Sequence, residues 1–160
     1  MIKHGKIYPI HGIAKSHLKP IAEFVTKGVA DSKENITLTP KACDVKGAKR
    51  FNGQECVIAK ALTRTLKPQA VAIGRSTAFA VFNGLAVRFL VPKASRLLVE
   101  EFDQRGRARS APIDLCAPFK SQRIRAKKVG GNTGPAHQKK KSRMRPYGVR
   151  AVGGGIEVPM

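Results

Sequence analysis

The stretch TAFAVFNGLAVRFLV, residues 77–91, carries the strongest structural signal in the chain. Two apolar runs flank Asn83-Gly84, a pair that favours a two-residue β-hairpin because both central positions of a type I′ turn need positive φ. The sequence therefore predicts antiparallel strands over 77–82 and 85–91. One face of the hairpin is expected to carry four stacked cross-strand neighbours: Phe79, Val81, Val87 and Phe89.

An amphipathic helix is predicted on each side of this hairpin. The first follows Asn52-Gly53-Gln54-Glu55, where an Asn with an acid three residues later is typical of a helix start, and it ends before Pro68. Its apolar face holds Val57, Ile58, Ala61, Leu62 and Leu66. The second begins at Pro92 and carries apolar residues three and four apart through Phe102. Thr39-Pro40 also predicts a short helical turn through residue 45.

Further strands are predicted over 36–39, 70–73 and 113–116, where β-branched and apolar residues alternate or cluster. The order β-α-β-β-α-β is typical of an α+β fold. We expect one small sheet with two helices on one face, and a ferredoxin-like split β-α-β is the closest standard topology.

The predicted domain occupies residues 36–116 and has an extension at each end. Residues 1–35 predict a short amphipathic helix over 10–25, interrupted at Pro20, and then a polar linker over 28–35. Residues 117–160 form a basic arm, rich in Gly and Pro and without apolar periodicity, that is not expected to fold alone.

Positive charge is concentrated in this arm. The chain has 31 Lys and Arg against 10 Asp and Glu, a net charge of +21. Residues 117–160 hold eleven of these basic residues and one acid, so about a quarter of the chain carries nearly half of the excess. Such a balance points to polyanionic partners.

The arm is therefore the predicted nucleic-acid-binding element, through charge neutralisation at backbone phosphates. Its candidate contacts are Lys120, Arg123, Arg125, Lys127, Lys128, Lys139, Lys140, Lys141, Arg143, Arg145, Tyr147 and Arg150. Tyr147 and Phe119 are candidates for stacking on an exposed base. A solubilising tail or a nuclear import signal is the alternative interpretation of the same charge.

Catalytic, metal and cofactor sites are not predicted. The four histidines (His4, His11, His17 and His137) do not pair on one helical face, and the three cysteines (Cys43, Cys56 and Cys116) lack metal-ligand spacing. The sequence has no phosphate loop, and its carboxylates cluster on a helix surface where solvation is the simpler role. The absence of long apolar runs and the odd cysteine count predict an intracellular protein that is neither secreted nor membrane-bound.

Residues 36–119 also resemble small, uncharacterised proteins encoded by bacteriophages. The shared features are an Ile-Thr strand at Ile36, a helix with Glu55-Cys56-x-Ile58-Ala59-x-Ala61-Leu62, a Val-x-x-Gly-x-Ser/Thr strand from Val71, and Val91-Pro92 leading into a helix that ends in Phe102-Asp103. A closing strand before Pro118-Phe119 completes the pattern. The resemblance implies a phage source and a shared fold, and it implies no activity.

These features lead us to expect a non-enzymatic structural component of a phage or virus particle. Its domain would contact other proteins of a large assembly, and its arm would contact the packaged DNA or RNA. Such a protein would be found in the virion or in the host cytoplasm. A ribosomal protein with an extension threaded into RNA is one alternative, and a free nucleic-acid-binding regulator is another.

Overall fold

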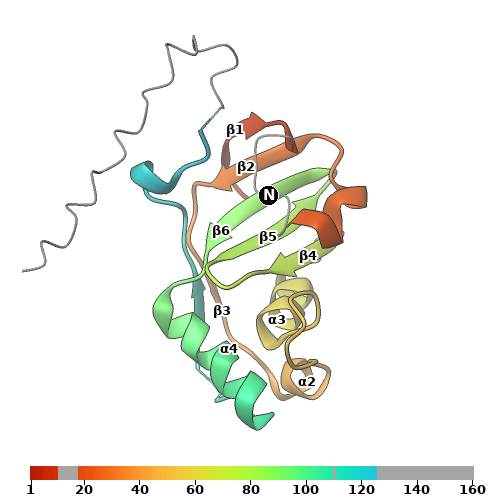
Figure 1. Ribbon diagram of the computed structural model, residues 1–160, viewed down its shortest axis with the longest axis vertical. Coiled ribbons are helices and arrows are strands. Elements are labelled where there is room, and N and C mark those ends of the chain that lie inside the picture. The colour runs from red at the N-terminus through yellow and green to blue at the C-terminus, as the bar shows by residue number, and fades with distance from the viewer. Residues whose placement is uncertain (11–17, 110, 126–160) are drawn as a thin grey trace, which may run out of the picture. The chain divides into compact units, whose positions relative to one another are not determined.

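A computed structural model describes residues 1–10, 18–109 and 111–125 (Figure 1). Residues 11–17 of the predicted N-terminal helix and the predicted arm beyond residue 125 lie outside the described part. The fold is α+β, with a mixed five-stranded sheet and a few helices.

The main sheet has the predicted hairpin at its centre. Among the described residues its strands are β1 (His4–Tyr8), β2 (Gly28–Ser32), β4 (Ala70–Ile73), β5 (Thr77–Phe82) and β6 (Leu85–Leu90). Their spatial order is β1-β2-β6-β5-β4, with β2 parallel to β6 and the other neighbours antiparallel. Asn83 and Gly84 have φ of 49° and 81°, the positive values that a type I′ turn requires.

The register of the hairpin differs from our prediction by one residue. The two-residue turn pairs Phe82 with Leu85, so Phe79 lies opposite Arg88 and Ala78 lies opposite Phe89. Directly opposed residues share a face of the sheet, and successive residues alternate. Phe79 therefore lies on one face and Phe89 on the other, and the predicted four-residue stack on a single face is wrong.

A second, two-stranded sheet is formed by β3 (Ile36–Leu38) and β7 (Ile113–Leu115), which are antiparallel. One backbone bridge between Leu90 and Cys116 joins it to the end of β6. Strands are thus present at the predicted positions, but their placement in a single sheet with a ferredoxin-like split β-α-β topology is wrong. The reason is that β2 and β5 occupy both sides of β6, which leaves β3 and β7 to pair with each other.

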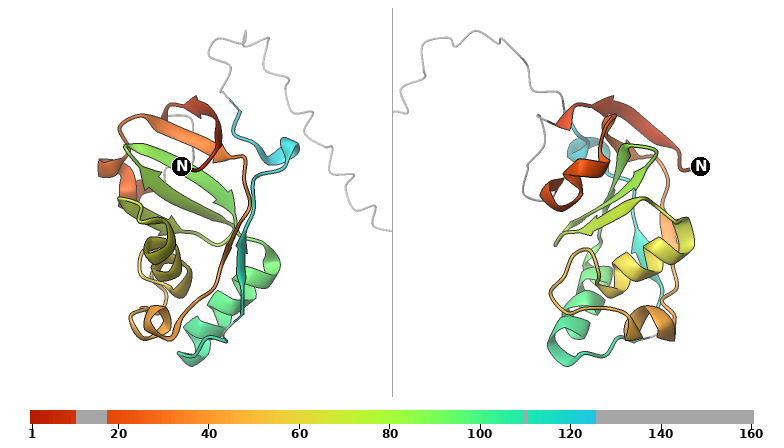
Figure 2. Two further views of the ribbon diagram at one scale, coloured as in Figure 1. Left: turned by 180° about the vertical axis from the view of Figure 1, so that it is seen from behind. Right: turned by 90° about the vertical axis from the view of Figure 1, so that its right-hand side faces the viewer.

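Two helices pack against the same hydrophobic cluster. Both α3 (Val57–Leu66) and α4 (Lys93–Arg105) lie close to their predicted positions, and α2 (Ala42–Lys46) precedes them (Figure 2). The cluster is made chiefly by Ile58, Ala61, Leu62, Ala78, Ala80, Val87, Phe89, Ile113 and Leu115, with Leu98 and Val99 of α4 packed against it.

The starts of two helices differ from the predicted ones. The N-cap of α3 is Cys56, because the side chain of Asn52 instead accepts hydrogen bonds from the backbone N–H groups of Gln54 and Glu55, at 2.9 and 3.2 Å, in the preceding turn. The N-cap of α2 is Lys41 rather than Thr39, because the Lys41 N–H donates to Asp44 Oδ2 at 2.9 Å.

The N-terminal region is the largest departure from our prediction. The predicted linker is wrong over 28–32, which form β2, a strand buried along its whole length beside β6. Residues 4–8 form β1 at the edge of the same sheet. The described part of the predicted helix is the short 3-10 helix η2 (Lys19–Phe24), whose Ile21 is fully buried.

This region covers the second face of the sheet. A cluster there is formed by Leu18, Ile21, Val25, Val29, Ala72, Phe79, Val81 and Ala86. The centre of the sheet is therefore buried on both faces, by α3 on one side and η2 on the other, and α4 packs on β7 and α3 at the border of the first cluster.

Asp44 links α2 to α3 and makes the stability depend on pH. Burial raises the pKa of its carboxyl, but hydrogen bonds from Arg64 and from the Lys41 N–H outweigh burial and hold the pKa below its usual range. The Arg64 Nη2–Asp44 Oδ2 distance is 2.8 Å. A depressed pKa means that the pair stabilises the fold above about pH 4 and that this contribution is lost as the pH falls through the folded-state pKa.

We therefore expect Asp44→Asn to lower the free energy of unfolding at pH 7 and to have progressively less effect below about pH 4. Urea denaturation of the parent and the variant at pH 7 and pH 3 measures the difference. An equal loss at both pH values would show that the charge of Asp44 does not matter.

Candidate nucleic-acid interface

The described part of the predicted arm begins directly after β7. Residues 117–125 leave the two-stranded sheet, form the short 3-10 helix η3 (Lys120–Gln122), and return to the main sheet (Figure 1). Lys120, Arg123 and Arg125 are all exposed, and none of the three forms an ion pair with any described residue. These three cations are thus available to a polyanion at the base of the arm.

A buried ion pair holds this base in place. Arg88 of β6 donates from Nε to Asp31 Oδ1 of β2 at 2.6 Å, and the two side chains are 16% and 10% exposed. The other oxygen of Asp31 accepts the backbone N–H of Ile124 at 2.7 Å, and Arg88 Nη2 donates to the Gln122 carbonyl at 2.5 Å. Asp31 and Arg88, on adjacent strands, therefore bind the backbone of the departing chain at Ile124 and at Gln122.

Apolar packing adds to this attachment. The half-buried side chain of Ile124 packs against the cluster on the η2 side of the sheet, whereas its neighbours Arg123 and Arg125 are exposed. Alternation in extended chain places neighbouring side chains on opposite sides. The sequence Arg-Ile-Arg thus keeps one residue on the body and two charges toward solvent. We call Asp31, Arg88 and Ile124 the arm anchor.

Asp31→Asn should loosen the arm anchor because it removes the charge that Arg88 faces in a largely buried position. Losing one partner of such a pair costs up to about 3–5 kcal/mol, and Asn retains an acceptor, so we expect the lower part of this range or less. Amide hydrogen exchange should accelerate at Ile124 more than at Phe89. Unchanged exchange at Ile124 would show that Asp31 does not hold the arm.

The remaining predicted contacts lie outside the described residues: Lys127, Lys128, Lys139, Lys140, Lys141, Arg143, Arg145, Tyr147 and Arg150. Phe119 lies one residue before η3 and is 70% exposed. It stays a candidate for stacking on a base.

The cysteines in the described part differ in their surroundings. Cys56 is buried, and burial raises the pKa of its thiol. Burial, and secondarily the nearby Asp114 carboxylate, raises the pKa of Cys116. A raised pKa disfavours the thiolate, which is the nucleophilic form. Across residues 1–10, 18–109 and 111–125, no three His, Cys, Asp or Glu side chains group as metal ligands would.

The arm anchor was not predicted, although the sequence contains one signal for it. Arg88 interrupts an otherwise apolar strand, and a charged residue in a buried strand needs a partner. The identity of that partner could not be predicted, because Asp31 was assigned to a linker.

None of the helices among the described residues has the length and apolar content needed to cross a bilayer. Comparisons of the chain with protein-family models, with curated proteins and with solved structures gave no match.

Proposed function

We propose that this protein is a non-enzymatic structural component of a phage or virus particle and that its basic arm contacts the packaged genome. The observation that carries the proposal is the attachment of a strongly basic segment to a folded body through the arm anchor. Such an attachment fixes where the arm leaves the body, so a body held in a shell would direct the arm toward the genome.

The charge of the arm supports backbone contacts rather than recognition of a base sequence. Lys and Arg that neutralise phosphates release condensed counterions, which gives an affinity that depends steeply on salt and little on sequence. Gly and Pro between the two basic clusters, 120–128 and 139–145, disfavour one continuous helix and suit an extended chain along a phosphate surface.

The body offers a surface suited to a protein partner. A hollow of about 430 Å³ lies beside the edge strand β1, with mostly apolar walls that include Ile2, Ile7, Leu66, Phe82 and Leu85. The outer edge of β1 pairs with no other described strand. An open sheet edge beside apolar side chains is a common feature of surfaces that bind other proteins.

The proposal is tested by finding which native particle contains the protein. Lysates of infected cells are fractionated by sedimentation, and peptides of the protein are quantified by mass spectrometry in the virion, ribosome and soluble fractions. We expect enrichment with virions at constant stoichiometry to the shell protein. Enrichment with ribosomal particles, or recovery only in the soluble fraction, would contradict the proposal.

A further inference from the structure

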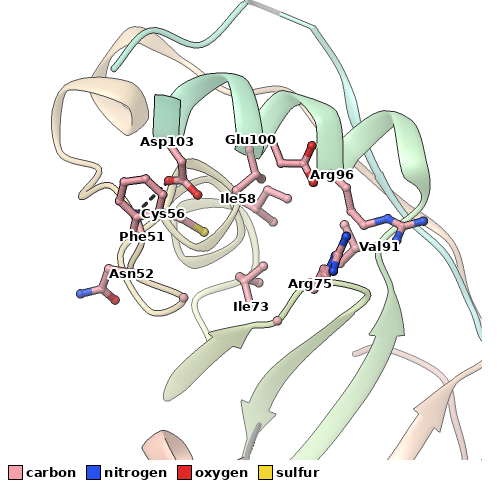
Figure 3. Close-up of a pocket in the computed structure, with 13 residues that line it drawn as sticks. Phe51, Asn52, Cys56, Ile58, Ile73, Arg75, Val91, Arg96, Glu100 and Asp103 are labelled. Atoms are coloured by element: carbon pink, nitrogen blue, oxygen red, sulfur yellow. Dashed lines mark hydrogen bonds between the residues drawn. The ribbon is translucent and has the colours of Figure 1, made fainter. Parts of the chain in front are cut away.

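A cavity of about 310 Å³ on the helix side of the body has no role in the proposed function (Figure 3). It lies between the loop at residues 51–53, the start of α3, the end of β4 and one side of α4. Its apolar wall is formed by Cys56, Ile58, Ile73, Val91 and Val99. The volume is at the lower end of the range for small-ligand pockets, roughly 300–1,000 Å³, and suits one compact group.

An exposed aromatic ring stands at one end of this cavity. Phe51 is 78% exposed and has a φ of 56°, in the left-handed region that bulky residues rarely adopt. Its backbone N–H donates to Asp103 Oδ1 at 2.9 Å, and Arg50 donates to the carbonyls of Asp103 and Gln104 at 2.6 and 2.7 Å. Three hydrogen bonds to the end of α4 thus hold a large apolar side chain in solvent and in an unfavourable conformation.

Two unpaired cations stand at the other end. In Figure 3 the guanidinium groups of Arg75 and Arg96 lie near Val91, away from Phe51. Neither forms an ion pair with a described residue, and Arg96 Nε is buried without a hydrogen-bond partner. Glu100 lies one turn after Arg96 on α4, yet the two are not within ion-pair distance. Two guanidinium groups without an ion-pair partner among the described residues make this end of the cavity suited to an anion.

The two acids of the cavity differ in position. Asp103 is adjacent to the ring and already accepts the Phe51 N–H, and Glu100 lies between Asp103 and the arginines (Figure 3). One carboxylate, that of Asp103, therefore lies at the ring end of the cavity, and the two guanidinium groups lie at the other end with Glu100 on their side. A ligand that fits carries a flat apolar ring with amino donors on one side and an anionic group on the other.

We propose that this cavity binds one nucleotide unit of a single strand, with its base against Phe51 and its phosphate toward Arg75 and Arg96. Aromatic side chains bind unpaired bases of any sequence by stacking, and guanidinium groups bind phosphate oxygens in pairs. Bases inside a duplex cannot reach such a site. The inference rests on the proposed function and deepens it, because it adds single-strand selectivity to a chain whose arm binds phosphates without selectivity.

The test compares Phe51→Leu with Phe24→Leu in the full-length chain. Phe24 is a matched control, since it is 41% exposed on η2 and does not line the cavity. The probes are fluorescent oligo(dA), oligo(rA) and a duplex of equal length, titrated by anisotropy at two salt concentrations. We expect Phe51→Leu to weaken binding of both single strands about tenfold, with the duplex affinity and the salt slope unchanged. Weaker binding of oligo(dA) alone, or of oligo(rA) alone, would identify whether the site accepts deoxyribose or ribose.

A second comparison addresses the end of the cavity that holds the two arginines. Arg96→Gln should weaken single-strand binding, whereas Arg107→Gln, an exposed arginine outside the cavity, should not. Adenosine monophosphate added to the ¹⁵N-labelled full-length protein should shift the amide signals of residues 51–53 and 73–75 in the parent and not in Phe51→Leu.

These measurements separate the two proposals. Steeply salt-dependent binding of oligonucleotides, with no effect of Phe51→Leu and no shifts from the mononucleotide, would overturn the cavity assignment and leave the arm proposal standing. Shifts at the cavity in a chain without measurable affinity for duplex would support the cavity and contradict the arm proposal.

Discussion

Replacing the ten clustered basic residues of the arm by Gln is expected to lower affinity for a random-sequence duplex by on the order of a thousandfold at moderate salt. The reason is counterion release, which contributes a slope of roughly 0.9 in log affinity against log salt for each phosphate neutralised. The substituted residues are Lys120, Arg123, Arg125, Lys127, Lys128, Lys139, Lys140, Lys141, Arg143 and Arg145. Titration at two salt concentrations should show a lower affinity and a flatter slope.

The matched control exchanges each Lys for Arg and each Arg for Lys at the same ten positions. Charge is conserved, so we expect a modest change, with some loss where Arg makes bidentate phosphate contacts. Circular dichroism of the parent complex should show no large gain in helix. An arm that tolerates Gln throughout, or a large gain in helicity on binding, would contradict an extended, charge-driven contact.

Substitution is a cleaner test than truncation after residue 117. Such a truncation would remove Ile124 and Gln122 and leave Asp31 and Arg88 without two of their partners. A loss of binding could then reflect a disturbed body. A chain that ends after Arg125 keeps the arm anchor and is the better deletion variant.

Phe89→Ala is expected to lower the free energy of unfolding by about 3–5 kcal/mol. Phe89 is fully buried in the cluster against which α3 and α4 pack, and it pairs with Ala78, whose small side chain cannot fill the space. This loss is a large share of the stability of an ordinary domain. Urea denaturation followed by circular dichroism measures it.

Leu97→Ala is the control for Phe89→Ala because Leu97 is 53% exposed on α4. We expect it to cost less than about 1 kcal/mol. Leu62→Ala, fully buried on α3, should cost about 2–5 kcal/mol. A Phe89→Ala variant as stable as Leu97→Ala would mean that the packing of the helices on β6 is wrong.

Local signals predicted most elements between residues 36 and 116. The Asn83-Gly84 turn, the apolar face of α3 and the start of α4 after Pro92 each depend on neighbours a few residues apart, and the structure has all three elements. The hairpin register was recoverable from the same signal, because a two-residue turn determines which residues face each other.

Pairings between distant segments could not be predicted in the same way. The parallel pairing of β2 with β6 joins residues more than fifty positions apart, and β2 contains Asp31 and Ser32, which resemble a linker when read locally. Burial of Asp31 is favourable only because Arg88 and the backbone of the arm complete its environment, and the hydroxyl of Ser32 donates to the Glu34 carbonyl. The assignment of residues 28–32 therefore required the sheet order, which short-range patterns do not contain.

The candidate sites show the same difference between features that local sequence predicts and features that only the fold brings together. Charge along the chain identifies the arm, since clusters of Lys and Arg are visible in the sequence itself. The cavity at Phe51 has no such signature, because its walls come from a loop, a strand end and two helices that meet only in the fold.

The central claim, that the arm contacts the genome inside a particle, is tested most directly by ultraviolet crosslinking in purified native virions. After nuclease and protease digestion, mass spectrometry identifies the peptides that carry a nucleotide. We predict crosslinks in peptides from residues 117–150, with Phe119 and Tyr147 as the aromatic sites. Virions that contain the protein and yield crosslinks in other proteins, but none in residues 117–150, would contradict the account.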